Sequence, residues 1–164
     1  MSDALHANCF DASALLKLYV PEERSKELRT YWHSESTRYT TSLCFNETLT
    51  LLKVCRFYRK TIDSADYERA TVDLSFWHGA VSKKVPELNF HSPEVFFATQ
   101  RIAKKHELDL SDAFQIHSVK EGFFSKMCGD SKTLLVTADK ELAKAARAEG
   151  LRVWNIMEGP APQS

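Results

Sequence analysis

Short apolar runs alternate along the chain with longer segments in which apolar residues recur at helical spacing. The short runs predict strands at 7–11, 38–42, 88–91, 133–137 and 151–155. The longer segments predict helices at 13–19, 22–33, 43–60, 64–83, 93–105, 110–121 and 139–149. Strands separated by helices favour a mostly parallel sheet with helices on both faces. We therefore expect an α/β fold, a three-layer α/β/α sandwich with a mostly parallel central sheet.

The chain has 164 residues, a length that suits a single domain. We expect this domain to span residues 1–157, and we expect the Pro- and Gly-containing segment 158–164 to be a disordered tail. The four cysteines form no C-x-x-C pair, which favours reduced thiols. The N-terminus lacks a signal-peptide pattern and no apolar run reaches membrane-spanning length. These features predict a cytoplasmic protein without a membrane association.

Two aspartates directly follow predicted strands. Asp11 comes after the apolar Cys9 and Phe10, and Asp139 comes two residues after Thr137 at the end of the run "TLLVT". A buried lone carboxylate costs several kcal/mol unless a charge, hydrogen bonds or a metal compensate it, so each position needs a reason. Both aspartates could cap the helices that follow them. Thr137 could likewise be a cap, or a hydroxyl that binds an acid or a metal-bound water.

Two further acids fall on apolar helix faces. Glu47 shares a helical stripe with Leu43 and Leu51, and Asp112 begins a stripe that continues through Ile116. Glu47 could simply lie at the margin of its stripe. Asp109 could be the N-cap of the second helix, with Asp112 in its first turn, a pattern that has no catalytic meaning.

Together the four acids suggest a metal site. The carboxyl ends of parallel strands meet at one edge of a sheet, where binding sites form. Carboxylates gathered there repel one another unless cations neutralise them. Oxygen ligands without a His or Cys set suit Mg²⁺ or Mn²⁺. Such a site favours a nuclease, in which the metal activates water and stabilises charge on phosphorus.

Four stretches of the sequence resemble the PIN-domain ribonuclease family, and the toxin subunits of VapBC-type toxin–antitoxin pairs in particular. These stretches are "FDASALLKLYVPE", "TTSLCFNETLTLL", "LDLSDAFQIHSVKE" and "VTADKELAKAARAEGLRVWN". They occur in the family's order with compatible gaps, and they run from about Cys9 to Asn155. The resemblance implies a Mg²⁺- or Mn²⁺-dependent endoribonuclease on a PIN-like fold. It also implies a role for Asp112 rather than Asp109.

The resemblance assigns roles to individual residues. Asp11, Glu47 and Asp112 match the three core acids, and Asp139 matches the more variable fourth. Ser13 and Thr137 match positions of supporting hydroxyl groups. We expect Asp11 and Asp112 to bind the metal directly, and Glu47 and Asp139 to act directly or through water. The expected reaction is hydrolysis of an RNA phosphodiester that leaves a 5′-phosphate and a 3′-hydroxyl.

RNA has to bind a local basic patch, because Lys plus Arg and Asp plus Glu both number 22 and the formal net charge is zero. Lys53, Arg56 and Lys60 fall on one helical face, for which a solvated surface is the simplest reading. The resemblance implies a homodimer and a protein antitoxin, and the same basic residues could contact that antitoxin.

Three other functions stay open. A PIN-fold nuclease could process RNA outside a toxin–antitoxin pair. A Mg²⁺-dependent phosphatase could use a similar sheet, although "DASA" lacks the second acid of a D-x-D motif. A catalytically silent module could only bind a partner, although such a module is expected to lose an acid and all four are present.

Overall fold

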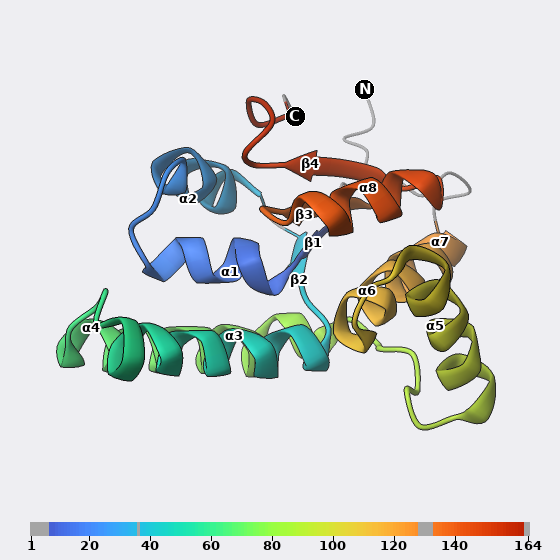
Figure 1. Ribbon diagram of the computed structural model, residues 1–164, viewed down its shortest axis with the longest axis horizontal. Helices are drawn as coiled ribbons and strands as arrows, with labels where there is room; N and C mark the ends of the chain where they lie inside the picture. Colours follow the sequence, from blue (N-terminus) through green and yellow to red (C-terminus); the bar gives the residue numbers. More distant parts are fainter. Residues whose placement is uncertain (1–6, 36, 128–132, 163–164) are drawn as a thin grey trace.

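The fold is a four-stranded parallel sheet with helices on both faces (Figure 1). This computed structural model describes residues 7–35, 37–127 and 133–162. The strands are β1 (Ala7–Phe10), β2 (Thr37–Tyr39), β3 (Leu134–Thr137) and β4 (Arg152–Asn155). The α/β/α sandwich expected from the sequence is therefore confirmed.

Helices connect the strands and extend the layers. Two precede β2: α1 (Ala12–Tyr19) and α2 (Ser25–Ser34). Between β2 and β3 lie α3 (Ser42–Val54), a π-helical turn η1 (Cys55–Arg59), α4 (Ser64–Ala80), a 3₁₀ turn η2 (Ser82–Lys84), α5 (Pro93–His106), α6 (Leu110–Glu121) and α7 (Phe123–Met127). One helix, α8 (Lys140–Ala148), joins β3 to β4.

The alternation of side chains along the strands builds two cores. In β1, Phe10 faces one core, whereas Ala7 and Cys9 face the other. In β3, Val136 lies in the first core and Leu135 in the second. Helices α1 to α4 cover the first face, and α6 and α8 contribute to the second. The central strands are buried on both faces, which explains the continuous apolar sequence of β3 and the mainly apolar sequence of β1, where the buried Asn8 has side-chain hydrogen bonds.

The order of the strands is β2-β1-β3-β4. The chain passes from β1 to one neighbour, β2, and later enters the sheet again on the opposite side of β1 as β3. The winding direction therefore reverses between β1 and β3. In open parallel sheets this switch point, at the carboxyl ends of the strands, is where ligands bind. Asp11 follows β1 and Asp139 follows β3, so both acids lie at this point.

The strand predicted at 88–91 is wrong. This segment is an irregular connection between η2 and α5. Its Asn89 accepts hydrogen bonds from the backbone of His91 and Ser92, which bends the chain into a turn. The apolar Phe90 packs edge-on against Phe114 instead of pairing in the sheet.

The end of the chain contacts the body of the protein. Gly159 accepts a hydrogen bond from the indole nitrogen of Trp154, and Ala161 donates its backbone N–H to Glu27 on α2. In the described residues, no helix is both long and apolar enough to cross a bilayer.

Candidate active site

The site begins at the buried carboxylate of Asp11, which is the N-cap of α1. Its Oδ2 accepts hydrogen bonds from the hydroxyls of Ser13, at 2.5 Å, and Thr137, at 2.8 Å. Burial raises the pKa of Asp11, while these hydrogen bonds oppose the shift. The two hydroxyls expected to support the site therefore do contact this acid.

A buried polar layer lies beneath Asp11. The thiol of Cys44 lies 3.9 Å from Asp11 Oδ1, and it also contacts the side-chain oxygen of Gln115. Gln115 is fully buried and donates to the sulfur of Cys9 at 3.3 Å. Burial raises the pKa of the Cys44 thiol, which keeps it protonated and able to donate. We did not single out Gln115 from the sequence, although it stands one helical turn after Asp112.

Glu47 and Asp112 form the half-buried middle of the site. Glu47, on the second turn of α3, accepts a hydrogen bond from Ser111 at 2.7 Å. Burial raises the pKa of Glu47, and the charges of Asp11 and other acids raise it further. Burial and the neighbouring acids Asp11, Asp109, Glu47 and Asp139 together raise the pKa of Asp112 to about 8.

Asp109 and Asp139 form the exposed rim. Each is an N-cap: Asp109 accepts from the backbone of Asp112 at 3.0 Å, and Asp139 accepts from the backbone of Leu142 at 2.9 Å. The capping function considered for both residues is therefore present. Their charges also act on the inner acids, so capping and membership of the acid group occur together. Ser111 links the rim to the middle, because its hydroxyl also contacts Asp109.

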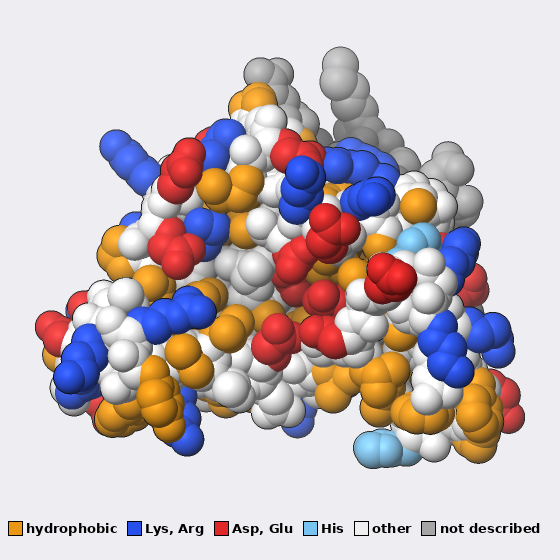
Figure 2. All heavy atoms as spheres, viewed as in Figure 1, with side chains coloured by type: hydrophobic (Ala, Val, Ile, Leu, Met, Phe, Trp, Pro, Cys, Tyr) orange, Lys and Arg blue, Asp and Glu red, His pale blue; other side chains and the backbone are white. Residues whose placement is uncertain are grey.

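The five acids thus range from exposed positions at the surface to the buried end of β1. We call Asp11, Glu47, Asp109, Asp112 and Asp139 the acid cluster. Figure 2 shows red side chains gathered in the middle of one face of the molecule. Among the described residues, no Lys, Arg or His forms a salt bridge with any of the five. Within this part of the chain, the cluster therefore has no cationic side chain paired with it.

The carboxylate oxygens of the acid cluster are of the type that binds a hard divalent cation. The side chains do not lie close enough together to coordinate one in their present positions. In the described part of the chain, no three His, Cys, Asp or Glu side chains form a ready-made metal site. Mutual repulsion keeps carboxylates apart, and an oxygen of Asp11, Asp109 and Asp139 is engaged in hydrogen bonds. A carboxylate has two oxygens, so each of these acids retains capacity for a metal. Asp112 has no side-chain hydrogen bond in the described region.

The basic residues expected to contact RNA or a partner lie apart from the inner acids. Lys53 is exposed near the end of α3, Arg56 lies in the π-helical turn, and Lys60 ends that turn. The Arg56 guanidinium lies over the ring of Phe57, 5.4 Å from its centre. From Glu47 to Lys60 the chain advances by 13 residues, about 20 Å of helix. These residues are therefore not part of the acid cluster's metal-binding geometry.

Comparisons with known proteins support the fold. No family model matches the sequence, and no curated protein matches it. Among solved structures, the chain is similar to the crystal structure of PAE2754 from Pyrobaculum aerophilum, with a TM-score of 0.54 and 20% sequence identity over 90% of both chains. At this level of identity the likeness shows a shared fold.

Proposed function

We propose that this protein is a metal-dependent endoribonuclease that hydrolyses RNA phosphodiester bonds and leaves 5′-phosphate and 3′-hydroxyl ends. One observation carries the proposal: five acids gather at the switch point of a parallel sheet without a cationic partner among the described residues. Four sequence motifs resemble those of PIN-domain ribonucleases. Their order and spacing support the proposal independently.

The acid cluster would hold Mg²⁺ or Mn²⁺. Asp11 and Asp112 are the expected direct ligands, with Glu47 and Asp139 direct or through water. When bound, the cation lowers the pKa of a water molecule and offsets charge on the phosphate. Asp109 adds a fifth negative charge to the acid cluster. This charge increases the attraction for a cation, although Asp109 is not required as a ligand.

The surrounding residues fix the acids in place. Ser13 and Thr137 hold one oxygen of Asp11, and Ser111 holds one oxygen of Glu47. Helices α1, α6 and α8 all begin at the site, so the partial positive charges of their N-termini point at it. These dipoles favour a bound phosphate and partly offset the repulsion among the acids.

We further propose that the nuclease is the toxin of a type II toxin–antitoxin pair, acts in the cytoplasm and forms a homodimer. Lys53, Arg56 and Lys60 would contact the RNA or the protein antitoxin. A nuclease that processes RNA outside such a pair has the same acid cluster and differs in having no antitoxin. Co-expression with the product of a neighbouring gene, followed by co-purification, separates these two roles.

The decisive experiment measures RNA cleavage. Purified protein is incubated with structured RNA and with p-nitrophenyl phosphate, in Mg²⁺, Mn²⁺ or EDTA. We expect cleavage of the RNA that EDTA abolishes and that Asp11→Asn lowers by about 100-fold or more. Glu68→Gln removes an exposed acid from α4 and serves as the matched control with unchanged cleavage.

Two outcomes would contradict the proposal. Turnover of p-nitrophenyl phosphate without RNA cleavage would indicate a phosphatase. No activity in a protein with native circular dichroism would indicate a module that only binds a partner.

A further inference from the structure

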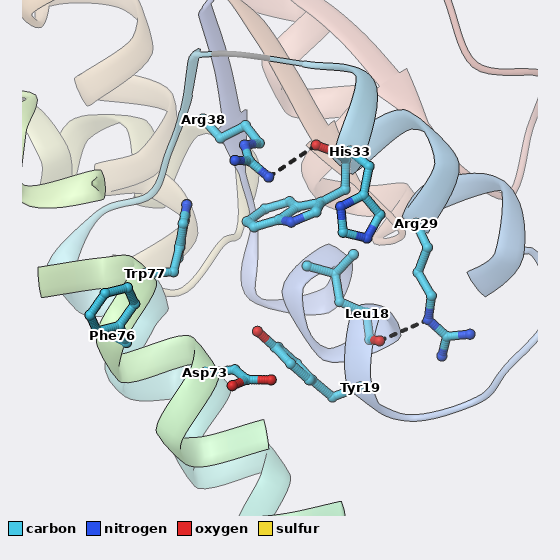
Figure 3. Close-up of a pocket in the computed structure, with 9 residues that line it drawn as sticks. Leu18, Tyr19, Arg29, His33, Arg38, Asp73, Phe76 and Trp77 are labelled. Atoms are coloured by element: carbon cyan, nitrogen blue, oxygen red, sulfur yellow. Dashed lines mark hydrogen bonds between the residues drawn. The ribbon is translucent and has the colours of Figure 1, made fainter. Parts of the chain in front are cut away.

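A cavity lies on a different part of the molecule from the acid cluster. It has a volume of about 480 Å³ and lies between the end of α1, α2, β2 and α4 (Figure 3). Its wall includes Tyr19, which is eight residues beyond Asp11 along α1, or about 12 Å of helix. A cavity of this size is in the range that binds small organic ligands.

Two arginines line this cavity at different ends, and neither has an acidic partner among the described residues (Figure 3). Arg38 donates to the backbone oxygen of Trp32 at 3.1 Å, and its guanidinium lies over the Trp32 ring, 4.6 Å from the centre. Arg29 donates to the backbone oxygen of Leu18 at 2.9 Å. Within the described residues neither arginine forms a salt bridge. Partly buried guanidinium groups without a counter-charge favour binding of an anion.

Buried donors in the same wall also lack acceptors. The Nε of Arg38 and the indole nitrogen of Trp77 are both inaccessible to solvent and have no hydrogen-bond partner in the described structure. Trp77 as a whole is 7% exposed to solvent. Unsatisfied buried N–H groups are uncommon in native proteins, so each requires an explanation. An acceptor that enters the cavity and draws these side chains toward it would satisfy both.

The remaining wall is aromatic and acidic. The rings of Trp32 and Trp77 lie 4.8 Å apart at 60°. Tyr19 and Asp73 lie together on the side of the cavity opposite Arg38 (Figure 3). Burial, and after it the charge of Asp73, raises the pKa of Tyr19 to about 12. The Asp73 carboxylate has no hydrogen-bond or ion-pair partner among the described residues. It is therefore available to accept from the N–H groups of a ligand.

We propose that this cavity binds a nucleoside monophosphate, either as a free nucleotide or as a nucleotide of an RNA strand. The phosphate would lie against Arg38, whose planar guanidinium group matches an oxyanion, while Arg29 at the other end of the cavity would attract the anion through its charge (Figure 3). The base would pack against the aromatic side chains in the wall, the exposed ring of Phe76 and the edges of Trp32 and Trp77. A base with exocyclic amino hydrogens, such as guanine, would donate to Asp73. This binding does not require metal or catalysis at the acid cluster.

The experiment measures binding in EDTA by calorimetry and by the indole N–H resonances. The probes are guanosine monophosphate, guanosine, inorganic phosphate and a short 5′-phosphorylated oligoribonucleotide. We expect guanosine monophosphate to bind at least about 10-fold more tightly than guanosine or phosphate, because only it uses both ends of the cavity. Of the three tryptophans in the chain, we expect Trp32 and Trp77 to shift and Trp154 to stay unchanged.

Variants test the assignment of the residues. Arg38→Gln should weaken nucleotide binding at least about 10-fold, and Arg29→Gln should weaken it by less because Arg29 lies at the other end of the cavity. Arg69→Gln, which removes an exposed arginine on α4 already paired with Asp66, should not weaken it. Arg29 is partly exposed, so its variant remains informative if Arg38→Gln fails to fold. Trp77→Phe should weaken binding, and because Trp77 also packs in the first core, the variant's stability is measured alongside and should fall. Trp154→Phe removes an indole N–H that has a partner, and it should lower stability without affecting binding.

The oligoribonucleotide distinguishes the two sources of the ligand. Binding of the oligoribonucleotide that Arg29→Gln weakens would assign the cavity to RNA, and binding of the free nucleotide alone would assign it to a mononucleotide. If neither probe saturates the protein, or if both arginine variants bind as well as the wild type, the cavity is not a nucleotide site.

Discussion

At the scale of single residues, Asp112 shows how much the acid cluster depends on a cation. Its pKa rises to about 8, with burial as the largest cause and the charges of the other acids next. An acid whose folded pKa lies above its ordinary value of 3.8 lowers stability as the pH rises between those two values. Without a metal, Asp112 is therefore mostly protonated at neutral pH and carries an unfavourable charge above about pH 8.

We expect Asp112→Asn to stabilise the metal-free protein. At about pH 9 in EDTA the variant should gain about 2 kcal/mol in the free energy of unfolding, because it removes a buried charge from a repelling group. At about pH 4 the gain should disappear, since the wild-type residue is then protonated. Urea unfolding at both pH values measures the difference. A variant less stable than the wild type at alkaline pH would contradict the charge argument.

Asp109 combines two functions that substitution can separate. Its side chain caps α6 and its charge adds to the cluster. Serine can also accept the capping hydrogen bond, whereas alanine cannot. We expect Asp109→Ser to be more stable than Asp109→Ala by about 1 kcal/mol in thermal or urea unfolding. Equal stability of the two variants would show that the cap contributes nothing.

At the scale of secondary-structure elements, Glu149 joins three helices on the second face of the sheet. It ends α8 and contacts Lys105 and His106 on α5, each at 2.7 Å, and Lys120 on α6 at 2.7 Å. The hydrogen bond from His106 and those from the two lysines lower the pKa of Glu149 to about 2. The lysines are largely exposed, which screens part of this interaction.

Glu149→Gln should therefore destabilise the protein in a pH-dependent way. A depressed folded pKa gives stability that is present above the ordinary value of 4.5 and lost as the pH falls toward about 2. We expect a loss of about 1–2 kcal/mol at neutral pH, after allowance for screening, and a shrinking loss below about pH 4. Thermal unfolding followed across this range measures it. Glu158→Gln, which removes an exposed pair with Arg147, is the control and should change little.

The sequence predicted the secondary-structure elements well where every residue of a segment has the same surroundings, as in a strand buried on both faces. The apolar runs of β1 and β3 are buried on both faces, and their period and length identify them. The segment 88–91 failed because the turn at Asn89 and the packing of Phe90 outweigh its apolar character. The N-cap of α3 is Thr41, whose hydroxyl accepts the capping hydrogen bond from the backbone of Cys44, although the adjacent Ser42 is an equally suitable N-cap residue. Neighbouring hydroxyl residues offer equivalent caps, and only tertiary packing chooses between them.

At the scale of the whole molecule, the acid cluster draws on the full length of the chain. Asp11 follows the first strand, and Asp139 precedes the last helix. The sequence located four of its acids, because each breaks an apolar pattern or follows a strand. It could not place Asp109 in the cluster or Gln115 beneath it. Their contacts depend on how α6 packs against α3 and β1, which local patterns do not encode.

Because the cluster joins distant segments, a cation bound there should stabilise the entire fold. A ligand that binds only the native state adds about 2.7 kcal/mol at a concentration 100 times its dissociation constant. We expect saturating Mg²⁺ to raise the unfolding temperature of the wild type and of Glu68→Gln. In Asp11→Asn, which loses the innermost charge, we expect the shift to be small. Differential scanning calorimetry in Mg²⁺ and in EDTA measures it. Equal shifts in wild type and Asp11→Asn would mean that Mg²⁺ binds elsewhere, because only a cation at the switch point depends on the carboxylate that follows β1.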